Sequence, residues 1–146
     1  MKLSTRGRYG ARAMLDVAMQ GDGGLCHLKD IARRQEVSKK YLEHLVTRLE
    51  ANGLLRTARG AGGGVALAKA PSEITLLDIL HALEGSLAVV ECVDRPEVCS
   101  RAANCATRDV WIELGDIVSE FLGSISLEEL RERQRQKEAP ALTYSI

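Results

Sequence analysis

Two short helical patterns followed by a glycine-rich hairpin, between Leu28 and Ala68, constrain the fold of this chain more than any other feature. The first pattern spans Leu28–Gln35. The second spans Lys39–Ala51 and follows Ser38, whose hydroxyl can cap the start of a helix. A short helix, a tight turn and a capped second helix form the layout of a helix-turn-helix, although many helical hairpins share this layout.

The second predicted helix has an apolar face and a polar face at one-turn spacing. In a helix-turn-helix, the second helix enters the major groove of DNA. We therefore expect the polar face to meet DNA, and it carries Lys39, Lys40, Glu43, His44 and Thr47.

The hairpin that follows favours the same interpretation. Strands are predicted at Leu54–Thr57 and Val65–Ala68, and the turn between them holds Arg59 and four glycines within five residues. Glycine allows a backbone to approach a ligand closely. A nucleotide-phosphate loop would require Gly-Lys-Ser/Thr and a following helix, and neither is present. The hairpin is therefore predicted to be a wing, with Arg59, Gly60 and Gly62 meeting DNA.

Charge is distributed unevenly along the chain, although its net charge is zero. Residues 1–70 hold 13 Lys or Arg and 6 Asp or Glu, a net of +7, whereas residues 71–146 hold 7 and 14, a net of −7. A basic half favours contact with nucleic acid, and chance asymmetry on solvated faces is the alternative. Arg6 lies near the start of a predicted helix, Ser4–Gln20, where a cation opposes the helix dipole. Phosphate contact would explain its position, as would solubility.

Three of the four cysteines, Cys92, Cys99 and Cys105, fall within a polar stretch of fourteen residues that is predicted to be a loop. Three thiolates on one loop can converge on a metal ion or a cluster. Gaps of six and five residues fit poorly with the close pairs of structural zinc sites. Unliganded surface thiols, or a disulfide with a spare thiol, are the alternatives. The chain shows no secretory signal, which disfavours a disulfide.

The remaining C-terminal half is predicted to be helical. Thr75 caps a helix that ends at about Gly85, and Ser126 caps a final short helix. Between them, an apolar stripe at helical spacing comprises Trp111, Leu114, Val118, Phe121, Leu122 and Ile125. One small winged helix cannot cover so long a stripe, so we expect a homodimer; packing on the chain's own core is the alternative.

Five segments follow from these patterns. They are a winged helix-turn-helix DNA-binding region (1–70), a connecting helix (71–90), a cysteine-rich loop that is a candidate for binding a cluster (91–107), a dimerisation helix with the final short helix (108–130) and a flexible tail (131–146). No apolar run is long enough to span a membrane, so a cytoplasmic protein is expected. Without a C-x-x-C pair, a cofactor motif or paired carboxylates, we expect neither an enzyme nor a small-molecule substrate. A cluster-carrying redox or scaffold protein is the alternative function.

Together these motifs resemble the IscR/NsrR family of iron–sulfur-dependent winged-helix transcriptional regulators, and the IscR-type branch most. The resemblance covers essentially residues 1–130. Its motifs are Met1–Tyr9, Ala13–Ala18, Ser38–Leu45 with Tyr41-Leu-Glu43, Arg59–Gly64, and the three-cysteine loop followed by Trp111.

The resemblance implies a mainly α, homodimeric transcription factor that binds promoter DNA. It implies a 2Fe-2S cluster held by Cys92, Cys99 and Cys105, whose occupancy chooses the promoters bound, including those for cluster assembly. It also adds Tyr41 to the expected DNA contacts.

Two departures from the family pattern concern the cluster. Arg108 stands where the IscR pattern has a His, three residues after the last cysteine, and a guanidinium cannot act as a ligand. Arg8 and Arg12 likewise replace possible ligands in the first helix. The first gap is also one residue longer than the family pattern. A fourth ligand could then come from water, a thiol in solution, or the carboxylates of Asp94, Glu97 and Asp109.

Overall fold

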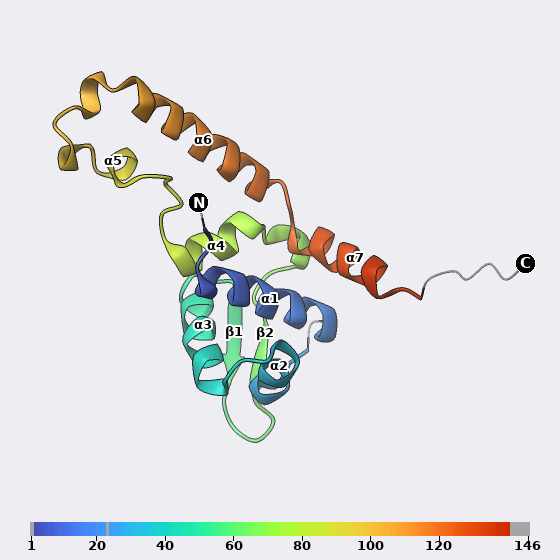
Figure 1. Ribbon diagram of the computed structural model, residues 1–146. Coiled ribbons are helices and arrows are strands. Elements are labelled where there is room, and N and C mark those ends of the chain that lie inside the picture. Colours follow the sequence, from blue (N-terminus) through green and yellow to red (C-terminus); the bar gives the residue numbers. More distant parts are fainter. Residues whose placement is uncertain (1, 23, 141–146) are drawn as a thin grey trace, which may run out of the picture.

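The computed structural model describes residues 2–22 and 24–140, and this part of the chain is mainly helical with one two-stranded sheet (Figure 1). The elements are α1 (Thr5–Gln20), α2 (Leu28–Gln35), α3 (Lys39–Ala51), β1 (Leu55–Ala58), β2 (Gly64–Leu67), η1 (Pro71–Glu73), α4 (Leu76–Glu84), α5 (Glu91–Asp94), η2 (Pro96–Val98), η3 (Ala102–Asn104), α6 (Ala106–Gly123) and α7 (Leu127–Glu138). The predicted fold class, mainly α with a helix-turn-helix and a wing, is confirmed.

Polar caps fix where the main helices begin. The Ser38 hydroxyl accepts a hydrogen bond from the N–H of Tyr41 at 3.1 Å, which starts α3. The Thr75 hydroxyl accepts from the N–H of Asp78 at 3.1 Å, and the Asp78 carboxylate accepts from the N–H of Thr75 at 2.9 Å. This reciprocal pair is a capping box, formed here with Asp in place of the preferred Glu or Gln. At the start of α7, the Ser126 hydroxyl accepts from the N–H of Glu129 at 3.0 Å.

The wing is an antiparallel hairpin in which Leu55 pairs with Leu67 and Ala58 with Gly64. Cys26 adds a bridge on the other side of β2, because its N–H donates to Val65 O at 2.7 Å and its carbonyl accepts from Val65 N at 2.8 Å. A Cβ atom at Gly64 would lie 2.3 Å from the Cys26 carbonyl oxygen, so this approach requires glycine. Cys26 is itself buried, with 7% of its surface exposed.

One hydrophobic core joins the helix-turn-helix, the wing, α4 and the start of α7. Side chains from all of these elements are fully buried in it: Met14, Ile31, Leu42, Leu45, Leu49, Val65, Ile74, Ile79, Leu83 and Leu127. At its edge lies a buried carboxylate, Asp16, which is only 5% exposed. Arg34 binds it through two nitrogens, at 2.7 and 3.0 Å, and the Gln35 amide donates to it at 2.8 Å. This ion pair fixes α2 against α1, because a buried charge requires a partner.

Three expectations for the C-terminal half are wrong. The cysteine segment is not a plain loop, because α5, η2 and η3 form within it. Ile125 does not belong to the exposed stripe: it is 5% exposed, and its carbonyl accepts from the N–H of Leu76 at 2.9 Å, beside the core. The polar segment from Arg131 is not a frayed tail as far as Glu138, because α7 continues that far. Residues 141–146 lie outside the described part of the chain.

Tertiary contacts explain the length of α7. Leu127 is fully buried, and the Arg131 guanidinium donates to the carbonyl of Ala18 at the end of α1 at 3.3 Å while also pairing with Glu128. These contacts offset the weak amphipathic pattern of the segment. No helix in the described residues is long and apolar enough to cross a membrane.

Candidate nucleic-acid interface and cysteine segment

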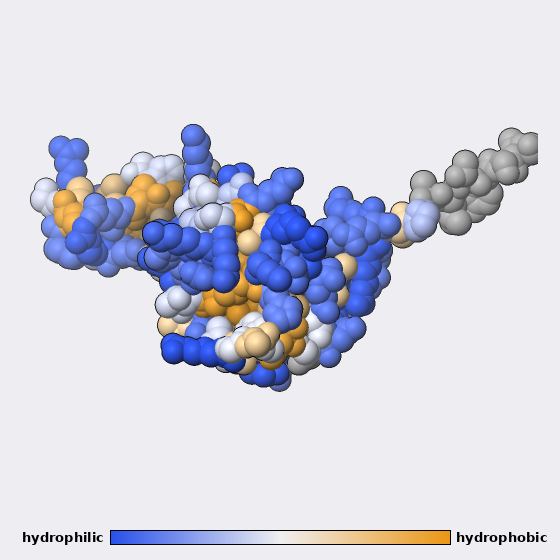
Figure 2. Space-filling view, turned by 90° about the horizontal axis from the view of Figure 1, so that it is seen from below, coloured by the Kyte–Doolittle hydropathy of each residue, from blue (hydrophilic) through white to orange (hydrophobic). Residues whose placement is uncertain are grey.

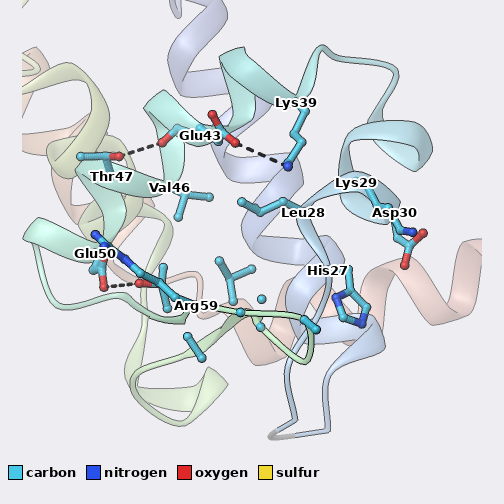
Figure 3. A pocket seen from close by; sticks show the side chains of 17 residues that line it. His27, Leu28, Lys29, Asp30, Lys39, Glu43, Val46, Thr47, Glu50 and Arg59 are labelled. Atoms are coloured by element: carbon cyan, nitrogen blue, oxygen red, sulfur yellow. Dashed lines mark hydrogen bonds and ion pairs between the residues drawn. The ribbon is translucent and has the colours of Figure 1, made fainter.

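A concave surface lies between the exposed face of α3, the start of α2 and the wing (Figure 3). Five residues that were expected to face DNA line it: Lys39, Glu43, Thr47, Arg59 and Gly60. Val46 and Val65, which are almost fully buried, form part of its floor. Figure 2, which views the protein from below, shows hydrophobic residues at the centre of this side with hydrophilic residues around them. The surface therefore has polar and charged edges and an apolar floor.

On α3, the charged groups in this surface are paired along the helix. Lys39 Nζ lies 3.8 Å from Glu43 Oε1, and both side chains are at least half exposed. The Thr47 hydroxyl donates to the Glu43 carbonyl at 2.8 Å. An exposed pair at this spacing contributes only about 0.3–0.5 kcal/mol, so either side chain can exchange it for an interaction with a ligand.

Several residues of this surface escaped prediction from sequence. Glu50, near the end of α3, accepts a hydrogen bond from the hydroxyl of Thr57 on β1 at 2.7 Å, and so ties the wing to α3. His27, Lys29 and Asp30 line the surface from the start of α2. Glu50 could have been predicted from its spacing, because it lies seven residues after Glu43 on the same helix and therefore on the same face. The contribution of α2 depends on how the helices cross, which periodicity does not encode.

Other predicted DNA contacts lie outside this concave surface. Lys40 and His44 are exposed elsewhere on α3, Gly62 is exposed in the turn of the wing, and Arg6 is exposed on α1. Tyr41 is different, because its ring packs edge-on against Tyr9 with centroids 6.3 Å apart. Its hydroxyl is enclosed and has no hydrogen-bond partner among the described residues. The structure thus places Tyr41 in the packing between α1 and α3.

The three clustered cysteines lie on the segment between α4 and α6. Cys92 belongs to α5, Cys99 follows η2, and Cys105 is the residue before α6; all three are free thiols, and none is buried. Hydrogen bonds from the Thr107 hydroxyl, 3.1 Å from Sγ, and from the N–H of Arg108 lower the pKa of Cys105 below its ordinary value. Burial, together with the charge of Asp16, raises the pKa of the separate Cys26 thiol.

Arg108 joins the two ends of the cysteine segment. Its Nε donates to the carbonyl of Cys92 at 2.9 Å and so ties the first turn of α6 to α5. The residue at the position of the expected His ligand therefore has a structural role in this chain. Because a guanidinium group carries hydrogen-bond donors and no acceptor, it supports the segment as a donor only.

The types of ligand atom present suit an iron–sulfur group. Three unpaired thiols lie on one exposed segment, and local hydrogen bonds lower the pKa of one of them. The three thiols are not gathered around one point. Within residues 2–22 and 24–140, no group of three His, Cys, Asp or Glu side chains is close enough to hold a metal ion.

Helix α6 projects from the body together with α5 (Figure 1). None of its residues is buried, and four large apolar side chains on it are exposed: Val110 (52%), Trp111 (37%), Ile117 (63%) and Phe121 (60%). In Figure 2 this arm carries hydrophobic residues at its surface. Of the predicted stripe, Leu114, Val118 and Leu122 are half-buried against neighbouring elements.

Comparisons with known proteins agree with this architecture. The sequence profile of the Rrf2 family, described as an iron-dependent transcriptional regulator, matches residues 3–133. The chain is 43% identical to the HTH-type transcriptional regulator IscR of Photorhabdus laumondii over 134 residues, which cover 92% of this chain and 81% of that protein.

Two solved structures are similar over nearly the whole chain. IscR of T. potens superposes with a TM-score of 0.78 at 35% identity, covering 96% of this chain and 93% of that one. CymR, the global cysteine regulator of B. subtilis, superposes with a TM-score of 0.75 at 38% identity, covering 91% and 98%. These relatives are transcriptional regulators and not enzymes. On the breadth of the family match and these identities, the chain belongs to the Rrf2 family of transcriptional regulators and is of the IscR type.

Proposed function

We propose that the protein is a homodimeric, sequence-specific DNA-binding regulator whose choice of promoters depends on an iron–sulfur cluster held by Cys92, Cys99 and Cys105. The observation that carries this proposal is the presence, in one chain, of a concave α3–wing surface and a separate segment with three free thiols. A regulator needs a part that contacts DNA and a part that changes state.

Contact with double-stranded DNA would use the two edges of the concave surface. Lys39 and Lys40 would bind phosphates, and Arg59 at the wing would reach a base edge or a phosphate. Glu43 would act as a discriminator, because its carboxylate repels phosphate but can accept a hydrogen bond from a cytosine amino group. His44, Arg6, Gly60 and Gly62 would contribute at the margins.

The homodimer would form through α6. Its exposed Trp111, Ile117 and Phe121 require cover, and a second copy of the same helix supplies matching apolar surface. Two-fold symmetry would also place two recognition helices on the two half-sites of a palindromic operator.

A 2Fe-2S cluster would supply a redox-sensitive group whose presence reports iron–sulfur status. Three thiols leave one coordination position for a carboxylate such as Asp94, Glu97 or Asp109, for water, or for a small thiol. Genes of cluster assembly are the expected targets. We infer a cytoplasmic location from the regulators to which the chain is similar.

The test compares promoter binding by cluster-loaded wild type with that by a variant carrying Ala at Cys92, Cys99 and Cys105. We expect affinities for at least one promoter class to differ by roughly 5–150-fold, the usual range of allosteric coupling. Visible and paramagnetic-resonance spectra of protein purified without oxygen identify the cluster, and Cys26→Ala is the matched control that keeps the spectrum. Identical binding of all promoters by both forms would refute cluster control, and a wild type without specific binding would refute the DNA role.

A further inference from the structure

One carboxylate at the end of α4 holds the first turn of α1. Glu84 Oε1 accepts hydrogen bonds from the backbone N–H of Ser4 at 3.2 Å, from the N–H of Gly7 at 3.1 Å, and from the Ser4 hydroxyl. Ser4 and Glu84 are 80 residues apart in sequence. A carboxylate at a helix N-terminus satisfies N–H groups that have no partner within the helix and complements the helix dipole. The Ser4 hydroxyl also accepts from the N–H of Gly7, at 3.2 Å, so Glu84 shares the capping of α1 with Ser4 and joins two distant segments.

Around this contact, α1 and α4 pack closely at two glycines of α1. A Cβ atom at Gly7 would lie 2.4 Å from Glu84 Oε1, and one at Gly10 would lie 2.0 Å from Leu83 Cδ1. Both glycines thus allow α1 to cross α4 at very short range. Because packed interiors are dense, a shift of the last turn of α4 must move the first turns of α1 with it.

Helix α3, which is expected to face DNA, contacts both α1 and the last turn of α4. Tyr9 on α1 packs edge-on against Tyr41 in the first turn of α3, with ring centroids 6.3 Å apart. Near the other end of α3, the Arg48 guanidinium donates to the carbonyl of Leu83 at 3.4 Å. The position of α3 therefore depends on α1 and on the end of α4.

On its other side, Glu84 adjoins the chain that leads to the cysteines. Gly85 ends α4 with a φ of +78°, and the linker that follows it enters α5, which carries Cys92. Glu84 lines a cavity with four linker residues, Ser86 to Val89, with Lys2 and Leu3 before α1, and with Val118 and Leu122 of α6. A rearrangement of the cysteine segment or of α6 would thus act directly on this carboxylate.

We propose that Glu84 is the positioning residue through which the state of the cysteine segment reaches α1 and α3. This inference rests on the proposed function, and it names the route of regulation within it. Glu84 touches neither DNA nor the cysteines; it acts by holding the first turn of α1 at the end of α4, so that α1, α3 and the linker move as one unit.

Two substitutions test separately the hydrogen bonds that Glu84 accepts and its negative charge. Glu84→Gln keeps an oxygen that can accept from Ser4 and Gly7, whereas Glu84→Leu removes the acceptor at similar size. The matched control is Glu73→Leu, because Glu73 also accepts from a backbone N–H, that of Ala70 at 3.2 Å, but lies away from the cysteine segment. Glu84→Ala also removes the acceptor and serves if Glu84→Leu does not fold, whereas Ser4→Ala would delete the capping hydroxyl of α1 as well.

Two measurements are made on each full-length protein. The first is the ratio of operator affinities between the cluster-loaded and cluster-free forms. Glu84→Leu should bring this ratio to within about twofold of unity, whereas Glu84→Gln and Glu73→Leu should keep the wild-type ratio. The second is amide hydrogen exchange in the cluster-free protein, where residues 4–10 should exchange faster in Glu84→Leu and at the wild-type rate in Glu84→Gln.

The outcomes distinguish this inference from the function on which it rests. A wild-type affinity ratio of one contradicts cluster control, and the inference fails with it. A wild-type ratio above one that Glu84→Leu, or Glu84→Ala in its place, leaves unchanged contradicts the inference alone. Faster exchange with an unchanged ratio would show that Glu84 is only a structural cap, and it would also overturn the proposal.

Discussion

The helix-turn-helix with its wing and the arm formed by α5 and α6 differ in how their apolar residues are covered. In the first region α3 buries Leu42, Leu45 and Leu49 almost completely. In the second, α6 buries no residue and exposes Ile117 and Phe121 by 60% or more. The first region is therefore stabilised by its own core, whereas the second leaves apolar surface that the single chain does not cover. Under the proposed function, this uncovered surface is where a second copy of the chain would pack.

The largest expected effect comes from removing a core side chain. Leu49→Ala should lower the free energy of unfolding by about 2–5 kcal/mol, because Leu49 is fully buried and its loss leaves a cavity. Phe121→Ala, at a 60% exposed position, should change monomer stability by no more than about 0.5 kcal/mol. Urea titration at a concentration that keeps the protein monomeric measures both, and equal losses would contradict the contrast between the regions.

Dimer formation should depend more on α6 than on the core of the helix-turn-helix, which reverses the order expected for monomer stability. Phe121→Asp places a charge in the apolar face of α6 and should weaken the dimer by about 2 kcal/mol or more, roughly thirtyfold in the dissociation constant. Sedimentation equilibrium measures the shift. Glu138→Asp, on the exposed end of α7, is the control and should dimerise as wild type does. A Phe121→Asp protein that stays fully dimeric would place the interface elsewhere.

DNA binding should respond to the wing more than to single cations on α3. Arg59→Ala should cost about 1–3 kcal/mol if Arg59 reads a base edge. Lys39→Ala should reduce affinity for all sequences and lower the salt slope by about one unit. Fluorescence anisotropy at several salt concentrations separates the two effects. If Arg59→Ala binds every duplex as well as wild type, the wing does not contact DNA.

The smallest expected effect concerns Arg108. Arg108→His removes the hydrogen bond to the Cys92 carbonyl and supplies an imidazole at the position of the family's ligand. If lack of a fourth protein ligand makes the cluster labile, the variant should lose its visible absorbance in air more slowly than wild type. Arg108→Gln tests the lost hydrogen bond without adding a strong metal ligand. Faster bleaching in both variants would mean that the hydrogen bond matters more than ligation.

The sequence by itself determined the local elements of this protein. Ser38 and Thr75 predicted the starts of α3 and α4, because a capping hydroxyl acts on a backbone N–H three residues away. The apolar spacing of α3 predicted its buried face, and the glycine-rich turn predicted the wing. These signals are short-range, so they can be read along the chain. The same spacing also predicted which face of α3 is exposed and forms part of the candidate DNA surface.

Only the tertiary structure decided the features that depend on which segments meet. Tyr41 was predicted to meet DNA, and only the structure shows that its ring also packs edge-on against Tyr9 of α1. Helix α7 docks on the end of α1, where Arg131 reaches the carbonyl of Ala18, 113 residues away. The contact between Glu84 and the start of α1 likewise joins residues with no local relation. Such contacts depend on how helices cross, and a one-dimensional pattern specifies the faces of helices but not the partners that those faces find.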